Sequence, residues 1–127
     1  MSGNAVPVVT LNDGHTLQQI ACGVYRIKPG DETYNAVASA LKLGYRHLDT
    51  AQLYGNEVSV GEAVRDSGIP REEIWITTKL NTFGGKYAYA ATLAQIDTQL
   101  EKLKTTYSAE PELDPVDPRV ASSPITL

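Results

Sequence analysis

The feature that most constrains the fold of this chain is a regular alternation of strand and helix patterns, with about 30 residues in each unit. Apolar residues at helical spacing predict helices, and short runs rich in β-branched residues predict strands. This alternation favours parallel βαβ units with right-handed crossovers. The pattern alone leaves two architectures open, a (β/α)8 barrel and an open doubly wound sheet.

The expected elements follow one another along the first 104 residues. A strand from Val6 to Leu11, a turn at Asn12-Asp13-Gly14 and a second strand from about Thr16 to Ile20 predict an N-terminal hairpin. Strands are also expected over Tyr45 to Thr50 and over Ile74 to Thr78.

Three helices are expected between and after these strands. Asp31 is predicted to cap the first, which has Tyr34, Val37 and Leu41 on one face and Gly44 at its end. Asn56 is predicted to cap the second, which has Val60, Ala63 and Val64 on one face and Gly68 at its end. Leu93, Ile96, Leu100 and Leu103 predict the apolar face of the third.

The composition changes from about Thr105 onward. Four of the seven prolines follow position 110, and no apolar run of strand length appears there. The parallel strand that should follow the third helix is therefore expected to be missing. Residues 1–104 are interpreted as a partial domain, and residues 105–127 as a proline-rich, extended or disordered tail.

Composition and charge exclude several classes of function. A net charge of −4 provides no basic surface for nucleic acid or for an anionic membrane. No apolar stretch approaches the roughly 18 residues of a membrane span, and no secretory signal pattern follows Met1. The single cysteine, Cys22, and two distant histidines argue against a disulfide framework or a zinc site, and we expect a cytoplasmic protein.

Three polar residues are expected at one end of the predicted sheet. Asp49 and Lys79 end neighbouring strands, and Tyr54 lies in the loop after the first of them. Catalytic groups of parallel α/β folds collect at this end. Each residue alone has a structural explanation, as a cap, a packing residue or a solvated charge. Together they indicate a proton donor, because an ammonium near a phenol favours the phenolate and a carboxylate keeps that ammonium charged. Such a donor serves a carbonyl that accepts hydride from a nicotinamide.

The stretch from Gly44 to Glu57 resembles the first signature of the aldo-keto reductases, a Gly-Tyr-Arg-x-x-Asp-Thr-Ala followed by Tyr-x-Asn-Glu. The resemblance continues through Val60 to Ala63, Gly68 to Glu73 and Ile76 to Lys79, and it covers about Val6 to Leu103. It implies the N-terminal part of a (β/α)8 TIM barrel whose bottom is closed by the hairpin. It also implies NADPH-dependent reduction of a small aldehyde or ketone.

The resemblance also implies the roles of particular residues. Asp49, Tyr54 and Lys79 match three members of the family's Asp-Tyr-Lys-His tetrad, with Tyr54 as proton donor. Gly23, Val24 and Asp49 are expected to contact NADPH, although Val24 lacks the hydroxyl that is common in the family. Tyr25 and Tyr54 are expected to line the substrate pocket, and no metal is expected.

The chain also departs from the family pattern. The fourth catalytic residue, a histidine on the strand after the third helix, has no match; His47 is expected to be packed and hydrogen-bonded, and His15 to lie at the surface. A TIM barrel needs about 250 residues, so an open edge and an unpartnered apolar barrel face are expected to cause self-association.

Two interpretations of function therefore remain, a carbonyl reductase and a non-catalytic fragment or interaction module. An open-sheet nucleotide-binding domain is disfavoured because the segment beginning Gly23-Val24-Tyr25-Arg26 is not Gly-x-Gly-x-x-Gly.

Overall fold

The computed structural model describes residues 6–81, 89–104 and 120–123, the last four by their backbone alone. The strands β3 (Cys22–Gly23), β4 (His47–Asp49), β5 (Trp75–Lys79) and β6 (Val120–Ser123) form a four-stranded sheet in that order. All three pairings are parallel. The predicted parallel strand–helix units are therefore confirmed, and within the described residues the sheet does not close into a barrel.

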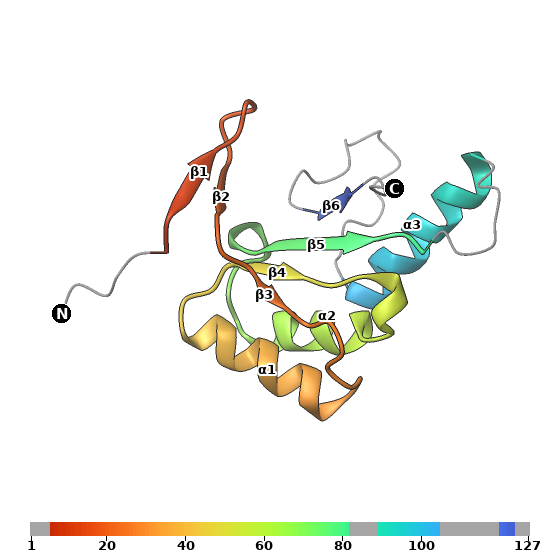
Figure 1. The fold of residues 1–127 in the computed structure, drawn as a ribbon, viewed down its shortest axis with the longest axis horizontal. Helices are drawn as coiled ribbons and strands as arrows, with labels where there is room; N and C mark the ends of the chain where they lie inside the picture. Colours follow the sequence, from red (N-terminus) through yellow and green to blue (C-terminus); the bar gives the residue numbers. More distant parts are fainter. Residues whose placement is uncertain (1–5, 82–88, 105–119, 124–127) are drawn as a thin grey trace.

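Helices follow each of the first three strands of this sheet. They are α1 (Asp31–Lys42), α2 (Glu57–Asp66) and α3 (Tyr89–Leu103), with short 3-10 turns at Gln52–Tyr54 and Arg71–Glu73. Figure 1 shows α1 and α2 beneath the sheet, with α3 beside α2. None of the described helices has the length and apolar character that would let it cross a membrane.

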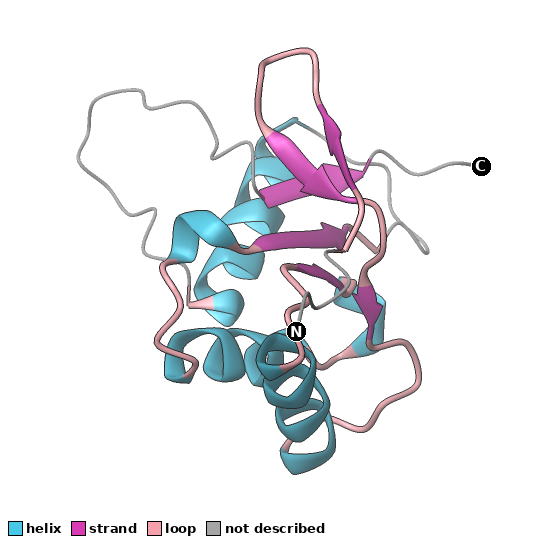
Figure 2. Cartoon of the chain, turned by 90° about the vertical axis from the view of Figure 1, so that its left-hand side faces the viewer, coloured by secondary structure: helices cyan, strands magenta, loops and turns pink. Residues whose placement is uncertain are grey.

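The predicted N-terminal hairpin is present, with β1 (Val8–Thr10) antiparallel to β2 (Thr16–Gln18). Figure 2 shows it at the end of the molecule opposite to two of the helices. Side-chain bonds tie β2 to the N-terminal ends of the sheet strands. Gln18 accepts from the Arg46 amide at 2.6 Å and donates to the Gly44 carbonyl at 3.1 Å, and the Trp75 indole donates to the Thr16 carbonyl at 2.8 Å.

The hydrophobic core lies between the sheet and the helices. Leu48 and Ile76 project from neighbouring strands and are almost fully buried. They pack with residues of α1, α2 and the end of α3, namely Val37, Leu41, Val60, Ala63, Val64 and Leu103. The apolar faces predicted for the first two helices are therefore confirmed.

The ends of the first two helices differ from the sequence prediction at their N-termini. Gly30, rather than Asp31, occupies the N-cap position of α1, and Asp31 is the first helical residue. Its carboxylate still lies where the helix dipole favours negative charge. Asn56 occupies the N-cap position of α2, but its side chain makes no capping bond. At the other end of α1, Gly44 has φ +97° and its amide bonds to the Leu41 carbonyl, as expected of a glycine that ends a helix.

The third helix buries less of its predicted apolar face. Leu103 is buried, Ile96 and Leu100 are half-buried, and Leu93 is 44% exposed. Figure 1 shows that the N-terminal half of α3 extends past the end of the sheet. The buried residue in the middle of the helix is instead Gln99, which is 2% exposed and bonds to groups of α2 and β5. Tertiary hydrogen bonding thus decides which residue of this face is buried.

The prediction that no strand follows the third helix is wrong. Residues Val120–Ser123 pair with Ile76–Lys79 as β6. The sequence Val-Ala-Ser-Ser is short and only half apolar, and it becomes a strand because the edge of β5 offers backbone partners. The remainder of the predicted tail, residues 105–119 and 124–127, lies outside the described residues.

The face of the sheet that points away from the helices carries Trp75 beside the hairpin and is otherwise polar at the described positions, so the expected apolar barrel face is only partly present. Side chains alternate along a strand, so His47, Asp49, Thr77 and Lys79 lie on the face opposite to Leu48 and Ile76. His47 bonds to Thr77, and Asp49 bonds to Lys79. These polar pairs satisfy one another, whereas an apolar face would require a covering layer.

Candidate functional site

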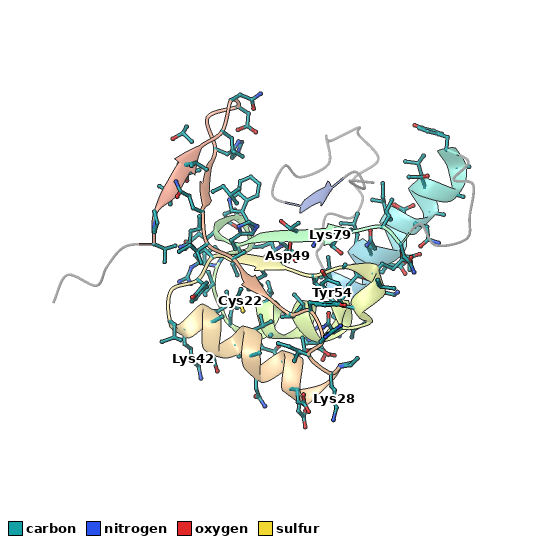
Figure 3. All side chains as sticks on the ribbon, viewed as in Figure 1. Cys22, Lys28, Lys42, Asp49, Tyr54 and Lys79 are labelled. Atoms are coloured by element: carbon teal, nitrogen blue, oxygen red, sulfur yellow. The ribbon has the colours of Figure 1, made fainter. Side chains whose placement is uncertain are left out.

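Asp49, Tyr54 and Lys79 come together at the C-terminal ends of two adjacent strands, as the sequence predicts. Asp49 is the last residue of β4, Lys79 is the last residue of β5, and Tyr54 ends the 3-10 turn that follows β4. The Lys79 ammonium nitrogen lies 2.8 Å from both Asp49 carboxylate oxygens and 3.1 Å from the Thr50 carbonyl oxygen. Figure 3 shows the three side chains at this end of the sheet.

The aromatic part of the site contacts the same ammonium. The Lys79 nitrogen lies 5.5 Å from the centre of the Tyr54 ring, within the range of a cation–π contact. The Tyr25 ring packs on the Tyr54 ring with 5.0 Å between centres and a 50° tilt. Tyr25 is 59% exposed, whereas Tyr54 is half-buried. The two rings therefore form one wall beside the charged pair.

The loop that carries Tyr25 is held from inside by Asn56. The Asn56 amide donates to the carbonyls of Val24 at 2.9 Å and Ile27 at 3.1 Å, and its oxygen accepts from the Thr50 hydroxyl at 2.8 Å. Asn56 is fully buried. Sequence reasoning assigned it to helix capping and missed this role, because the loop contacts join positions about thirty residues apart.

The predicted cofactor-binding residues differ in how they could face a ligand. Gly23 is exposed, and a Cβ atom built on it would meet no atom within 4 Å, so the space beside it is open. The Asp49 side chain is 33% exposed at the same end of the sheet. Val24 as a whole residue is 1% exposed and belongs to the core, and its amide and carbonyl bond to Asp49 and Asn56. Gly23 and Asp49 therefore fit a cofactor contact, whereas neither the side chain nor the backbone of Val24 faces the open space.

A second polar cluster lies directly behind Lys79 and was not predicted. The Thr78 hydroxyl donates to the Glu57 carboxylate at 2.6 Å. The Gln99 amide lies 3.0 Å from the same carboxylate oxygen and 3.1 Å from the Lys79 carbonyl. The signal available in the sequence was Gln99 itself, a polar residue on the apolar stripe of the third helix.

The two histidines lie where the sequence predicts. His47 is half-buried, and its ring nitrogens lie 3.0 Å from the Gln18 carbonyl and 2.9 Å from the Thr77 hydroxyl. His15 is exposed beside the hairpin turn, 3.2 Å from Asp13.

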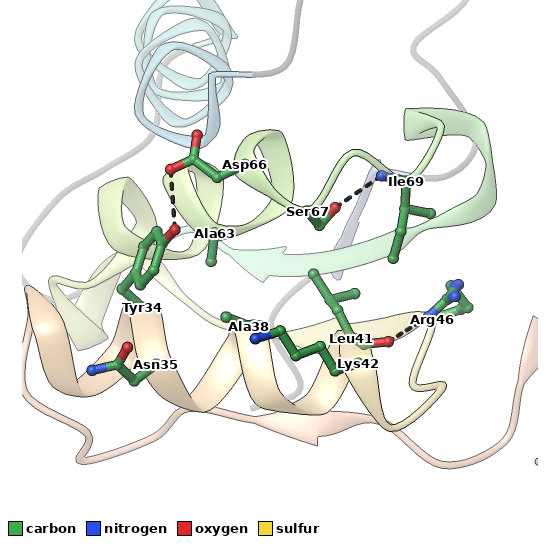
Figure 4. A pocket seen from close by; sticks show the side chains of 10 residues that line it. All are labelled: Tyr34, Asn35, Ala38, Leu41, Lys42, Arg46, Ala63, Asp66, Ser67 and Ile69. Carbon is green, nitrogen blue, oxygen red and sulfur yellow. Dashed lines mark hydrogen bonds between the residues drawn. The ribbon is translucent and has the colours of Figure 1, made fainter.

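A separate pocket of about 500 Å³ lies between α1 and α2, away from the C-terminal ends of the strands (Figure 4). The Tyr34 hydroxyl donates to the Asp66 carboxylate at 3.1 Å on one side of it. This bond raises the pKa of Tyr34, because ionising the phenol would place two negative charges together. The Arg46 guanidinium, on the other side, donates to the Leu41 carbonyl at 2.9 Å. These two bonds, one between side chains and one from a side chain to a backbone carbonyl, account for Tyr34, Asp66 and Arg46 without a ligand.

Comparison with known proteins decides the family. A model described as the aldo/keto reductase family matches residues 19–120. The chain belongs to the aldo/keto reductase family. An aldo-keto reductase of Mycolicibacterium smegmatis is 45% identical over 101 residues, which is 80% of this chain and 36% of that protein. A 9,11-endoperoxide prostaglandin H2 reductase of Trypanosoma cruzi is 44% identical over 99 residues, which is 78% of this chain and 34% of that protein.

Solved aldo/keto reductase structures match the fold as well as the sequence. The Brucella melitensis aldo/keto reductase superposes with a TM-score of 0.71 at 50% identity, over 80% of this chain and 39% of that one. The Bombyx mori aldo-keto reductase, solved in complex with NADP, superposes with a TM-score of 0.67 at 33% identity, over 80% of this chain and 36% of that one. The chain thus spans about a third of the length of these relatives and solved structures.

Proposed function

We propose that this chain carries the proton-donating part of an NADPH-dependent reductase that converts an aldehyde or ketone to an alcohol. The observation that supports this proposal is the position of the Lys79 ammonium, which contacts both the Asp49 carboxylate and the Tyr54 ring at the strand ends. Members of the aldo/keto reductase family are NAD(P)H-dependent oxidoreductases.

Tyr54 and Lys79 have different roles in the proposed reaction. The Tyr54 hydroxyl would give its proton to the carbonyl oxygen as negative charge develops there. Lys79, held in place by its ion pair with Asp49, would stabilise the phenolate that Tyr54 becomes. When bound, NADPH supplies the hydride that the carbonyl carbon accepts. One hydride and one proton together convert the carbonyl to an alcohol, so atoms and charge balance.

The remaining predicted site residues would position the two ligands. Gly23 and Asp49 would contact the cofactor, and Val24 would support them from the core. Tyr25 would line the substrate pocket together with Tyr54, since the two rings pack at 5.0 Å. We propose a small carbonyl compound as the substrate class. The named relatives span a prostaglandin H2 reductase and a glycerol 2-dehydrogenase of Saccharomyces cerevisiae, so their names do not narrow this class further.

A turnover measurement tests the proposal. The chain is mixed with NADPH and a reactive aromatic aldehyde, and loss of the nicotinamide absorbance is followed. Tyr54→Phe should lower the rate about 100-fold or more, because the proton donor is removed. Tyr34→Phe provides a matched control, since that hydroxyl bonds to Asp66 beside the separate pocket. Equal rates for the wild type and Tyr54→Phe would contradict the proposal.

The alternative is a non-catalytic fragment or interaction module. It is favoured by one observation, that the chain matches only about a third of its relatives' length. Cofactor fluorescence separates the two interpretations. Enhancement of NADPH fluorescence on titration with the chain supports the reductase, whereas the absence of both binding and turnover supports the fragment.

A further inference from the structure

We propose that Glu57, Thr78 and Gln99 are positioning residues for Lys79, which fix the end of β5 so that the ammonium stays against Asp49 and Tyr54. This inference rests on the proposed function for its catalytic meaning. The placement of Lys79 itself can be measured whether or not the chain is a reductase.

The three residues form a closed, buried hydrogen-bond cluster. They are between 1% and 2% exposed. The Glu57 carboxylate accepts from the Thr78 hydroxyl at 2.6 Å and from the Gln99 amide at 3.0 Å. The same amide lies 3.2 Å from the Thr78 hydroxyl oxygen and 3.1 Å from the Lys79 carbonyl oxygen. The cluster joins the start of α2, the end of β5 and the middle of α3.

Packing alone does not explain this cluster. Glu57 has no ion pair with any residue that the structure describes, and a buried carboxylate is costly unless hydrogen bonds and dipoles compensate it. Here it receives two hydrogen bonds and lies in the first turn of α2, where the helix dipole favours negative charge. Apolar residues of similar volume would fill the same space without this cost. The polar cluster must therefore contribute something other than packing, such as a fixed geometry.

The geometry that it fixes is that of Lys79. Gln99 holds the Lys79 carbonyl from the helix side of the sheet, and Glu57 holds Thr78 on the same side. On the opposite side, Asp49 and the Thr50 carbonyl hold the ammonium. Both ends of the residue are thus anchored. Loss of the backbone anchor would let the long side chain adopt more conformations, and the ammonium would spend less time in its three-acceptor position.

Hydrogen exchange of the lysine ammonium measures this placement directly. An ammonium held by three acceptors exchanges its hydrogens with solvent slowly and is visible in proton–nitrogen correlation spectra. The signal of Lys79 is assigned as the one that disappears in Lys79→Arg. Gln99→Leu removes both donors at similar volume and should accelerate exchange at Lys79 about three- to tenfold. Glu57→Gln keeps an acceptor oxygen and should stay within about twofold of the wild type. Thr98→Leu, an exposed position on the same helix, is the matched control and should change nothing.

The outcomes decide the inference whether or not turnover is observed. Unchanged exchange in folded Gln99→Leu would overturn it, as would equal acceleration in Thr98→Leu. If Gln99→Leu does not fold, the nearly isosteric Thr78→Val takes its place, with at least about twofold acceleration expected and unchanged exchange overturning the inference. A firmly held ammonium in a chain without NADPH turnover would contradict the reductase proposal and leave this inference standing.

Discussion

At the scale of residues, the three hydrogens of the Lys79 ammonium meet three acceptors, two from Asp49 and one from the Thr50 backbone. The pair is about one third exposed on each side. A pair this exposed contributes at most about 1 kcal/mol to stability. Its main consequence is therefore positional, because it keeps a positive charge beside the Tyr54 ring.

Asn56 should be among the residues most sensitive to truncation. Asn56→Ala removes one donor from each of the Val24 and Ile27 carbonyls and leaves the buried Thr50 hydroxyl without its Asn56 acceptor, and we expect it to lower the free energy of unfolding by about 1–3 kcal/mol. Urea denaturation measures the effect. Asn35→Ala, at an exposed position in α1, is the matched control and should stay within about 0.5 kcal/mol. A similarly small effect for Asn56→Ala would contradict the role of Asn56 in holding the loop that carries Tyr25.

Cys22 provides a prediction of pH dependence. Burial disfavours the thiolate and raises the pKa of Cys22. Because only the thiolate reacts with iodoacetamide, alkylation of the native chain should require a higher pH than alkylation of a free cysteine. At pH 8 the native rate should be lower than the rate in urea. Equal native and denatured rates at this pH would argue against a half-buried thiol.

The sequence could predict that Asp49, Tyr54 and Lys79 lie close together because strand ends can be placed from local patterns, and adjacent parallel strands bring their ends together. It could not identify Asn56 and Gln99, whose side chains hold the backbone next to these residues. Asn56 and Gln99 act on backbone carbonyls of other elements, and nothing in a local pattern says which carbonyl will be close. The hydrogen-bond requirement of a buried polar group becomes visible only once burial is known.

At the scale of elements, the crossing of α2 and α3 depends on one glycine. A Cβ atom on Gly61 would lie 2.3 Å from the Leu103 carbonyl oxygen, far inside van der Waals contact. The close approach lets Leu103 reach the core and brings Gln99 to the end of β5.

Gly61→Ala should therefore destabilise the chain although alanine favours helices by about 1 kcal/mol. We expect a net loss of about 2 kcal/mol or more in the free energy of unfolding, because α3 must shift away from α2. Ser39→Ala, at an exposed position in α1, controls for helix propensity. Greater stability in Gly61→Ala would mean that the helices do not cross this closely.

The helical and strand patterns of the first 104 residues were sufficient to predict the hairpin and the order of α1, β4, α2, β5 and α3. They were insufficient for β6. Val120–Ser123 has little intrinsic strand character, and its pairing is supplied by the neighbouring strand.

At the scale of the whole molecule, apolar side chains are exposed on the hairpin and next to β3. Val8, Val9 and Ile20 are 55%, 39% and 51% exposed. Within the described residues, the outer edge of β3 pairs with no strand. Unpaired edges and apolar surface favour association between chains.

We therefore expect the purified chain to self-associate and to have low thermal stability. Light scattering after size exclusion should give a mass above that of one chain, rising with concentration. A cooperative circular-dichroism melt in a demonstrated monomer would contradict this expectation.

Deuterium transfer is the most direct test of the central claim, that Asp49, Lys79 and Tyr54 form a carbonyl-reducing site. The chain is incubated with an aldehyde and NADPH that carries deuterium at the transferable position, and the alcohol is analysed by mass spectrometry. The account predicts an alcohol with one deuterium on its former carbonyl carbon, strongly reduced in Tyr54→Phe. Binding of NADPH with no labelled alcohol, or labelling unaffected by Tyr54→Phe, would contradict it.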